Sequence, residues 1–242
     1  MKGIILAGGT GSRLHPLTKV TNKHLLPMGN HPMIIHSIKK LVNANITDIM
    51  IITGTEHMGD MISLLGSGAE YDCSFTFRVQ DRPDGIGGAL ALCGNFVGTD
   101  SCVVILGDNI FEDPLGQYVE EFIQNNRNCQ LLLKEVSDPE RYGVAIFQGN
   151  RVTKIEEKPK HPKSNHAITG IYMYDNKVFD IISTLAPSPR GEYEITDINN
   201  AYINAGEMFY KVMKGWWTDA GTLISYQKAN QLVTSHQPRR EG

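Results

Sequence analysis

The pattern of apolar and polar residues in the first half of the chain alternates between strand-like runs and helical spacings. Short runs of strand-forming residues predict strands over residues 4–7, 49–53, 75–79 and 103–106. Apolar residues at helical spacing predict one helix that begins at Pro32 and another that carries Leu115, Val119, Phe122 and Ile123. Alternation of this kind predicts an α/β domain with a mainly parallel sheet.

The strand-like runs become more closely spaced after Arg127. They cover residues 131–136, 143–147, 151–155 and 168–174. We expect these runs to form a smaller β-rich lobe over the first sheet. Two further helices are predicted, one over residues 194–205 that ends at Gly206 and one over residues 222–234, followed by a tail at residues 236–242.

The composition is that of a globular protein, with 41% hydrophobic and 20% charged residues. A net charge of −3 gives no general attraction to nucleic acid or to an anionic membrane, so we expect neither as a partner. The cysteines are far apart in the chain, which predicts free thiols in the reducing cytoplasm and no zinc site. They are Cys73, Cys93, Cys102 and Cys129. The apolar run after Lys2 is too short for an export signal and ends in glycines.

A glycine-rich turn follows the first predicted strand directly. Its residues are Gly8, Gly9, Thr10, Gly11 and Ser12, and Arg13 and Lys23 follow as two cations. Successive N–H groups in such a turn can surround an anion, and an arginine fork suits phosphate oxygens, so the segment predicts a triphosphate site. A Walker A loop would need lysine at Ser12, and a dinucleotide fingerprint would need glycine at Leu14. Taken alone, the turn also fits an ordinary strand-to-helix connection with two surface cations.

Two acidic residues are candidates for holding a metal ion. Asp108 comes directly after the strand at residues 103–106, and ligands of open α/β sheets gather at such strand ends. Asp219 precedes the last predicted helix. Mg²⁺ is commonly held by one or two carboxylates together with substrate phosphates. Spacing alone favours a turn residue for Asp108 and a helix N-cap for Asp219.

The loop after the third predicted strand is a candidate for base recognition. The amide of Gln80 has a donor and an acceptor side by side, which matches the O4 and N3–H edge of thymine or uracil. The backbone of Gly85 could approach the same base. The alternative is a polar loop without a ligand.

Several ordered motifs resemble those of one enzyme family, the sugar-1-phosphate nucleotidylyltransferases. The segment from Leu6 to Leu14, followed by Lys23-His24-Leu25-Leu26-Pro27, resembles the signature of that family. The resemblance extends from Met1 to about Ala229 and is closest to the thymidylyltransferase branch, in a short form without the C-terminal extension. It implies a three-layer, Rossmann-like mixed sheet of the nucleotide-diphospho-sugar transferase type, with a smaller β-rich sugar-binding lobe. Within a single domain, 1–242, residues 1–127 would mainly bind nucleotide, 128–221 mainly sugar phosphate, and 222–242 would form the terminal helix and tail.

The same resemblance implies a reaction and its residues. It implies transfer of a thymidylyl group from dTTP to glucose 1-phosphate with Mg²⁺ as cofactor, giving dTDP-glucose and pyrophosphate, as the first step of dTDP-rhamnose supply for surface polysaccharide. The implied catalytic residues are Arg13, Lys23 and Lys158, and the metal ligands are Asp108 and Asp219. Nucleotide binding falls to Leu6, Ala7, Gly8, Gly9, Thr10, Gly11, Ser12, Arg13, Gln80, Gly85 and Asp108. Sugar-phosphate binding falls to Tyr142, Gly143, Glu157, Lys158, Ile168, Tyr172 and Arg190.

Departures from the family pattern and rival functions remain open at this point. His24 and Gly88 both stand where related chains often have glutamine. Uridylyl transfer is the alternative within the enzyme class, because Gln80 would face an edge shared by thymine and uracil. A catalytically silent nucleotide-sugar-binding regulatory protein is the alternative of another class. Family habit implies a homotetramer, and a short C-terminus predicts little feedback inhibition by dTDP-rhamnose at a separate site.

Overall fold

The computed structural model describes residues 1–236, so residues 237–242 of the tail predicted at 236–242 lie outside the described part of the chain. The strands are β1 (Lys2–Leu6), β2 (Pro27–Met28), β3 (His31–Pro32), β4 (Asp48–Thr53), β5 (Ser74–Val79), β6 (Cys102–Leu106), β7 (Asn109–Phe111), β8 (Cys129–Glu135), β9 (Gly143–Gln148), β10 (Arg151–Glu157), β11 (His166–Tyr174), β12 (Met208–Val212) and β13 (Trp217–Asp219). The α-helices are α1 (Met33–Val42), α2 (Met58–Leu65), α3 (Gly85–Ala91), α4 (Gly94–Val97), α5 (Gly116–Gln124), α6 (Val178–Thr184), α7 (Ile195–Ala205) and α8 (Leu223–His236).

A mixed sheet forms the centre of the molecule, with nine strands within residues 1–236. Its order is β10-β9-β11-β6-β1-β4-β5, and β8 pairs with β11 on one edge and with β12 on the other. The first strand, β1, lies between β4 and β6 and runs parallel to both. The strand order reverses at β1, and crevices that hold ligands form at such points, outside the carboxyl ends of the strands.

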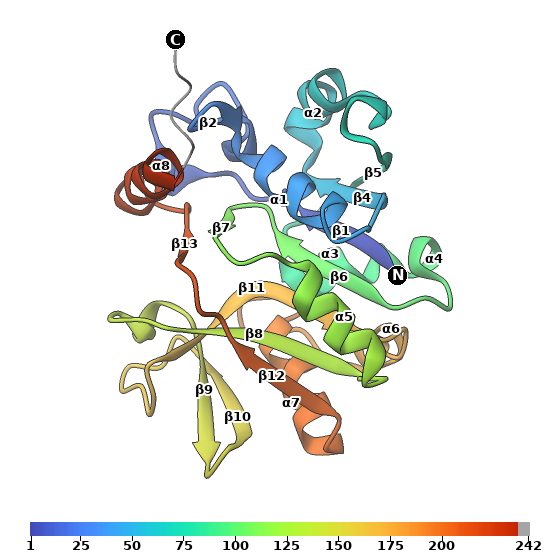
Figure 1. Ribbon diagram of the computed structural model, residues 1–242, viewed down its shortest axis with the longest axis vertical. Coiled ribbons are helices and arrows are strands. Elements are labelled where there is room, and N and C mark those ends of the chain that lie inside the picture. Colours follow the sequence, from blue (N-terminus) through green and yellow to red (C-terminus); the bar gives the residue numbers. More distant parts are fainter. Residues whose placement is uncertain (237–242) are drawn as a thin grey trace.

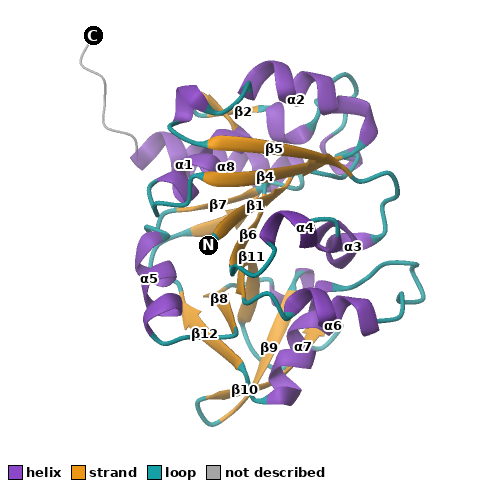
Figure 2. Ribbon diagram, turned by 90° about the vertical axis from the view of Figure 1, so that its right-hand side faces the viewer, coloured by secondary structure: helices purple, strands orange, loops and turns teal. Residues whose placement is uncertain are grey.

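Helices cover both faces of this sheet, as Figure 2 shows. Side chains alternate across a strand, so neighbouring residues of β1 enter different cores. Ile5 packs in a cluster with residues of α1, α2 and α5. Ile4 packs on the opposite face with residues of α3, α6 and α7. The three-layer α/β architecture expected from the sequence is therefore confirmed.

The predicted helices form close to their expected ends. Helix α1 begins one residue after Pro32, whose fixed φ and missing N–H suit the start of a helix. Helix α7 ends at Gly206, which takes the left-handed conformation that favours glycine after a helix. Ile123, expected on the buried face of α5, is instead 58% exposed.

The strands of the second half lie in the same sheet as the first half and not over it. Strand β11 joins the two halves, because it pairs antiparallel with β6 through residues 171–174 and also with β8. Figure 1 shows β8, β9, β10 and β12 at the end of the molecule away from β4 and β5. The β-rich lobe is thus a continuation of the central sheet.

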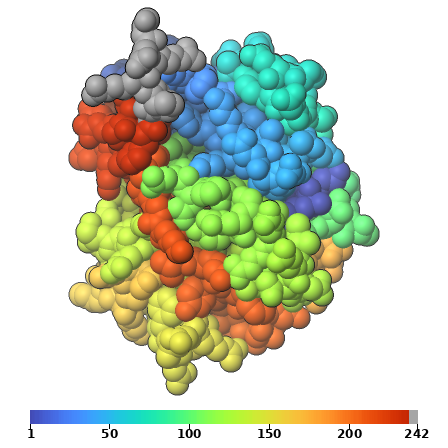
Figure 3. All heavy atoms as spheres, viewed as in Figure 1, coloured from blue at the N-terminus to red at the C-terminus, as the bar shows by residue number. Residues whose placement is uncertain are grey.

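The terminal helix α8 extends to His236 and packs against residues near the N-terminus. The hydroxyl of Tyr226 donates to the carbonyl of Pro27, and the N–H of Gly29 donates to Oδ1 of Asn230 at 2.9 Å. Figure 3 shows this helix, in red, on the surface beside the blue N-terminal segment. Helices of residues 1–236 include none with the length and apolar character needed to cross a membrane.

Candidate active site

A cleft of about 630 Å³ opens at the carboxyl ends of β1 and β6 and reaches the loop ends of β9, β10 and β11. Most of the residues predicted from the sequence line it: Leu6, Gly8, Gly9, Arg13, Lys23, Gln80, Gly85, Asp108, Tyr142, Gly143, Glu157, Lys158, Ile168, Tyr172 and Asp219. The other predicted residues do not belong to its lining: Ala7, Thr10, Gly11, Ser12 and Arg190. Residues from both halves of the chain therefore meet in one cavity.

The glycine turn enters the cleft through Gly8 and Gly9. Gly9 and Gly11 have φ values of +95° and +62°, a conformation that other residues adopt with strain. Within residues 1–236, the backbone N–H groups from Gly8 to Gly11 donate to no other backbone group. Leu14 is fully buried, so the residue in the place of a fingerprint glycine anchors the turn to the core. The turn therefore offers free N–H donors on a fixed support, as an anion site requires.

Lys23 and Asp108 form an ion pair inside the cleft. Nζ of Lys23 lies 2.5 Å from Oδ2 of Asp108, and the two side chains are only 14% and 15% exposed. Burial opposes ionisation of Asp108, but the charge and hydrogen bond of Lys23, together with the neighbouring His24, outweigh it and lower the pKa of Asp108 to about 2. Asp108 is thus a carboxylate at neutral pH, and its hard oxygens face the cavity.

The carboxylate of Asp219 is held by donors from two sides. Its Oδ1 accepts from Nη2 of Arg141 at 3.1 Å and from the hydroxyl of Tyr142 at 3.0 Å. Its Oδ2 accepts from the N–H of Gly221 at 3.1 Å and from the hydroxyl of Ser225 at 3.2 Å. Burial and the neighbouring Asp219 raise the pKa of Tyr142, which keeps its hydroxyl proton for this bond.

Both acidic side chains approach Gly221, together with Arg13. A Cβ atom on Gly221 would lie 3.1 Å from Oδ2 of Asp219, 3.3 Å from Nη2 of Arg13 and 3.6 Å from Oδ2 of Asp108. Residues 1–236 gather no group of three or more histidine, cysteine or acidic side chains that could hold a metal. Two carboxylates fit a hard divalent cation that takes its remaining ligands from phosphates and water.

A hydrogen-bonded chain that the sequence did not reveal supports Asp108. The indole N–H of Trp217 donates to Oδ1 of Asn109 at 2.9 Å, and Nδ2 of Asn109 donates to Oδ1 of Asp108 at 3.0 Å. A Cβ atom on Gly170 would lie 2.5 Å from Nδ2 of Asn109, so only glycine leaves room for this amide. The N–H of Trp217 thus orients a neighbour of a candidate metal ligand.

The sugar-side end of the cleft is built around Glu157. Its Oε2 accepts from the hydroxyl of Thr196 at 2.9 Å and lies 3.3 Å from the position of a Cβ atom on Gly143. Lys158 follows with φ of +43°, a conformation uncommon for a residue with a side chain. Its N–H donates to the carbonyl of Tyr142 at 2.9 Å, which ties the ends of β9 and β10 together. This backbone strain places Lys158 in the lining of the cleft beside Glu157.

The wall of this end comes from β11. Ile168 and Tyr172 are 8% and 4% exposed and line the cavity. Burial raises the pKa of Tyr172, so its hydroxyl stays neutral. The ring of Tyr172 stacks on that of Tyr174, whose hydroxyl donates to Oδ1 of Asn199 at 2.6 Å. Asn199 also lines the cleft, although no sequence motif distinguished it.

Arg190 lies outside the lining of the cleft, beside Glu192, which belongs to that lining. Its Nη2 donates to both carboxylate oxygens of Glu194 at 2.9 Å and lies 3.4 Å from Oε2 of Glu192. Its side chain is 52% exposed. A role as a second phosphate ligand would require Arg190 to leave these two partners, and it stays a prediction.

The loop predicted to recognise the base, residues 80–87, is hydrogen-bonded to the segment that precedes α7. The N–H of Gly87 donates to the carbonyl of Tyr193 at 2.9 Å, and the N–H of Tyr193 donates to the carbonyl of Asp84 at 2.8 Å. Gly85 has φ of +91°, and a Cβ atom there would lie 2.8 Å from the carbonyl oxygen of Tyr193. Gln80 and Gly85 therefore lie in a loop that is fixed by backbone hydrogen bonds, and both line the cleft.

His24, one of the two departures from the family pattern, is a core residue. It is 1% exposed and is absent from the cleft lining, and its Nδ1 lies 2.7 Å from Oδ1 of Asn22. Burial, and then the charge of Lys23, lower the pKa of His24 to about 3, so the ring is neutral at physiological pH. It supports the turn at Gly107, where a Cβ atom would lie 2.7 Å from the ring.

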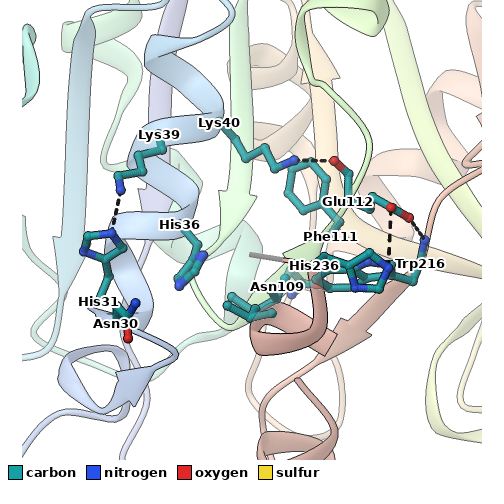
Figure 4. A pocket seen from close by; sticks show the side chains of 12 residues that line it. Asn30, His31, His36, Lys39, Lys40, Asn109, Phe111, Glu112, Trp216 and His236 are labelled. Atoms are coloured by element: carbon teal, nitrogen blue, oxygen red, sulfur yellow. Dashed lines mark hydrogen bonds and ion pairs between the residues drawn. The ribbon is translucent and has the colours of Figure 1, made fainter. Parts of the chain in front are cut away.

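A second hollow, of about 590 Å³, lies between α1, β7 and the end of α8 (Figure 4). Lys40 reaches from α1 to the carbonyl of Glu112 at 2.7 Å, and a Glu112 carboxylate oxygen accepts from the N–H of Trp216 at 3.1 Å. Asn109 lines both hollows. None of the residues predicted for nucleotide, sugar phosphate or metal lines this second hollow.

Comparisons with known proteins find relatives along nearly the whole chain. The model of the family described as nucleotidyl transferase matches residues 2–236. A glucose-1-phosphate thymidylyltransferase of Neisseria meningitidis is 39% identical over 98% of this chain and 84% of its own length. One from Xanthomonas campestris pv. campestris is 42% identical over 99% of this chain and 82% of its own length.

Solved structures give the same family and fold. A Bacillus anthracis protein described as a candidate glucose-1-phosphate thymidylyltransferase, crystallised in complex with a sucrose, is 60% identical with a TM-score of 0.95. That match covers 99% of this chain and 98% of the other. A UDP-glucose pyrophosphorylase complexed with UDP-glucose is 23% identical with a TM-score of 0.84 over 98% of this chain and 99% of its own, and shares the fold.

Proposed function

The chain belongs to the nucleotidyl transferase family, and we propose that its cleft transfers a thymidylyl group from dTTP to glucose 1-phosphate. The products are dTDP-glucose and pyrophosphate. We propose that this dTDP-glucose is used to make dTDP-rhamnose. One observation carries the proposal. The cations Arg13 and Lys23 line the cleft on the side of the glycine turn, Lys158 lines it on the sugar side, and Asp108 and Asp219 also face it.

The chemistry asks the protein to position two anions that repel each other. An oxygen of the sugar phosphate attacks the α-phosphorus of dTTP, and the bond from that phosphorus to the oxygen bridging to the β-phosphate breaks. The sugar phosphate is already ionised, so the step needs no general base. Catalysis then rests on placement and on neutralising charge in the transition state.

The residues divide this work between the two ends of the cleft. Lys158 holds the attacking phosphate, while Glu157 accepts hydrogen bonds from sugar hydroxyls. Arg13 and the N–H groups of the glycine turn stabilise the departing pyrophosphate. Lys23, which is paired with Asp108, bridges the phosphates. We propose Mg²⁺ as the divalent ion: Asp108 and Asp219 would hold it, and it would supply positive charge to the reacting phosphates.

The base specificity and the sugar are tested by one experiment. Pyrophosphate release is measured for dTTP, UTP, dCTP and ATP, each with glucose 1-phosphate, galactose 1-phosphate and mannose 1-phosphate. The proposal expects the highest kcat/KM for dTTP with glucose 1-phosphate. A higher value for UTP would replace it with uridylyl transfer. Nucleotide binding without turnover in any pair would make the chain a regulatory protein.

The assembly and location remain part of this proposal. We propose the homotetramer that the family resemblance implies, and light scattering of the purified chain measures it directly. We also propose a cytoplasmic location, because the four cysteines are free thiols, which are typical of a reducing compartment.

A further inference from the structure

The second departure from the family pattern, Gly88, leaves space that another side chain of the same loop occupies. A Cβ atom on Gly88 would lie 2.3 Å from Oδ1 of Asp84 and 2.4 Å from its Cγ. Non-bonded atoms do not approach a Cβ atom that closely, so any side chain at Gly88 would displace the carboxylate of Asp84 from its present place. The conformation of Asp84 therefore depends on the absence of a side chain at Gly88.

In that place, Asp84 holds the amide of Gln80. Nε2 of Gln80 donates to Oδ1 of Asp84 at 2.6 Å and to the carbonyl of Gly85 at 3.2 Å. A carboxylate oxygen and a backbone carbonyl only accept hydrogen bonds, so the amide group that faces them must be the NH₂. Both N–H bonds of Gln80 are then used within the loop.

This orientation leaves the amide oxygen of Gln80 as the group available to a ligand. Oε1 lies 3.4 Å from the position of a Cβ atom on Gly8, beside the glycine turn, and Gln80 lines the cleft. The backbone around Asp84 is also fixed, because its carbonyl accepts from the N–H of Tyr193 at 2.8 Å. The loop thus presents one acceptor in a defined direction.

We propose that Asp84 is a positioning residue for base recognition, which orients Gln80 as an acceptor, and that Gly88 makes this possible. The inference rests on the proposed function and deepens it. Thymine and uracil carry a donor at N3, which Oε1 of Gln80 accepts. Cytosine carries an acceptor at N3, which would face the amide oxygen as a second acceptor. Asp84 therefore selects against cytosine although it touches no base.

The test compares binding of dTTP and dCTP by titration calorimetry, with kcat/KM for both nucleotides as a second readout. Asp84→Ala frees the amide to rotate and should lower the preference for dTTP over dCTP about tenfold, the scale of one oriented hydrogen bond. Asp84→Asn keeps an oxygen that accepts from Gln80 and should stay within about threefold of the parent. Asp81→Ala, an exposed residue of the same loop, is the matched control and should change nothing.

Gly88→Ala tests the link between the two positions. It should lower the preference as Asp84→Ala does, because its methyl group displaces the carboxylate. In the Asp84→Ala background the same substitution should have little further effect, since neighbours that act through one contact are not additive. Melting temperatures of all variants establish that they are folded.

Two results would overturn the inference. One is an unchanged dTTP preference in Asp84→Ala, and the other is an equal effect of Gly88→Ala with and without Asp84. Binding is measured without turnover, so a parent chain that binds dTTP but releases no pyrophosphate would refute the proposed function and leave this test intact.

Discussion

Nζ of Lys23 lies 2.5 Å from Oδ2 of Asp108 in the interior of the cleft. The pair joins a cation predicted to bind phosphates to a carboxylate predicted to bind metal, and each side chain is sheltered from solvent. Removing one member leaves the other as an unpaired charge, which is costly in a partly buried site. Substitutions at either position should therefore affect both stability and activity.

Asp108→Asn is expected to lower kcat by roughly 10²–10³, the scale for one lost charge contact in a transition state. It should also lower the melting temperature slightly, because Lys23 loses its ionic partner. Pyrophosphate release at saturating Mg²⁺ and a thermal melt measure the two effects. Asp100→Asn, at an exposed position, is the control. Turnover near the parent value would remove Asp108 from the catalytic residues.

Arg13→Ala and Lys158→Ala should separate the two ends of the cleft. Arg13 faces the leaving pyrophosphate in the proposed reaction, so its loss should reduce kcat more than it raises the KM for glucose 1-phosphate. Lys158 holds the sugar phosphate, so its loss should mainly raise that KM. Steady-state kinetics with both substrates varied measure the split. If Lys158→Ala left the KM for glucose 1-phosphate untouched, the sugar site would lie elsewhere.

Thr196 should act on the sugar through Glu157, because its hydroxyl donates to Oε2 of Glu157 at 2.9 Å. Thr196→Val removes the donor at nearly constant volume and should raise the KM for glucose 1-phosphate by about three- to tenfold, the net worth of one ordinary hydrogen bond. Thr196→Ser keeps the hydroxyl and should behave like the parent. Equal KM values for the valine and serine variants would show that the hydroxyl does not position Glu157.

His24 should make stability depend on pH in the acid range. Burial lowers the pKa of this ring to about 3, whereas an unfolded chain has the ordinary value of about 6.5. The unfolded state therefore binds one more proton between these values. The contribution is fully present above pH 6.5 and is lost as the pH falls towards 3, at about 1.4 kcal/mol per pH unit.

The measurement is the free energy of unfolding of the parent and of His24→Gln at several pH values between 7 and 4. Glutamine does not titrate, so the free energy of unfolding of the parent should fall relative to that of His24→Gln as the pH falls. His161→Gln, at an exposed position, is the control. Parallel pH profiles for the parent and His24→Gln would contradict the assignment of His24 as a buried neutral ring.

Local patterns were sufficient to predict most of the elements of the first half and the glycine turn after the first strand. The runs at residues 4–7 and 103–106 became β1 and β6 because an unbroken apolar run can only be buried, and here both faces of the sheet are covered. The glycines after β1 predicted an anion-binding turn because backbone freedom is a property of those residues themselves. The placement of β9 and β10 could not be predicted in this way, since it depends on the pairing of β9 with one edge of β11 and of β10 with β9.

What the sequence alone determined is therefore the chemistry that neighbouring residues carry: the glycine turn, its two cations, the acidic ends of strands and the family that these motifs indicate. Only the tertiary structure decided which of these groups act on one another. Arg141 reaches Asp219 across 78 positions of the chain, and Trp217 reaches Asn109 across 108. Asp84 acquires its role because Gly88, four positions later in a turn of helix, leaves room for it. The contacts of Arg141 and Trp217 arise from the packing of distant segments, and that of Asp84 depends on the folded shape of its loop, so no pattern of residue types records them.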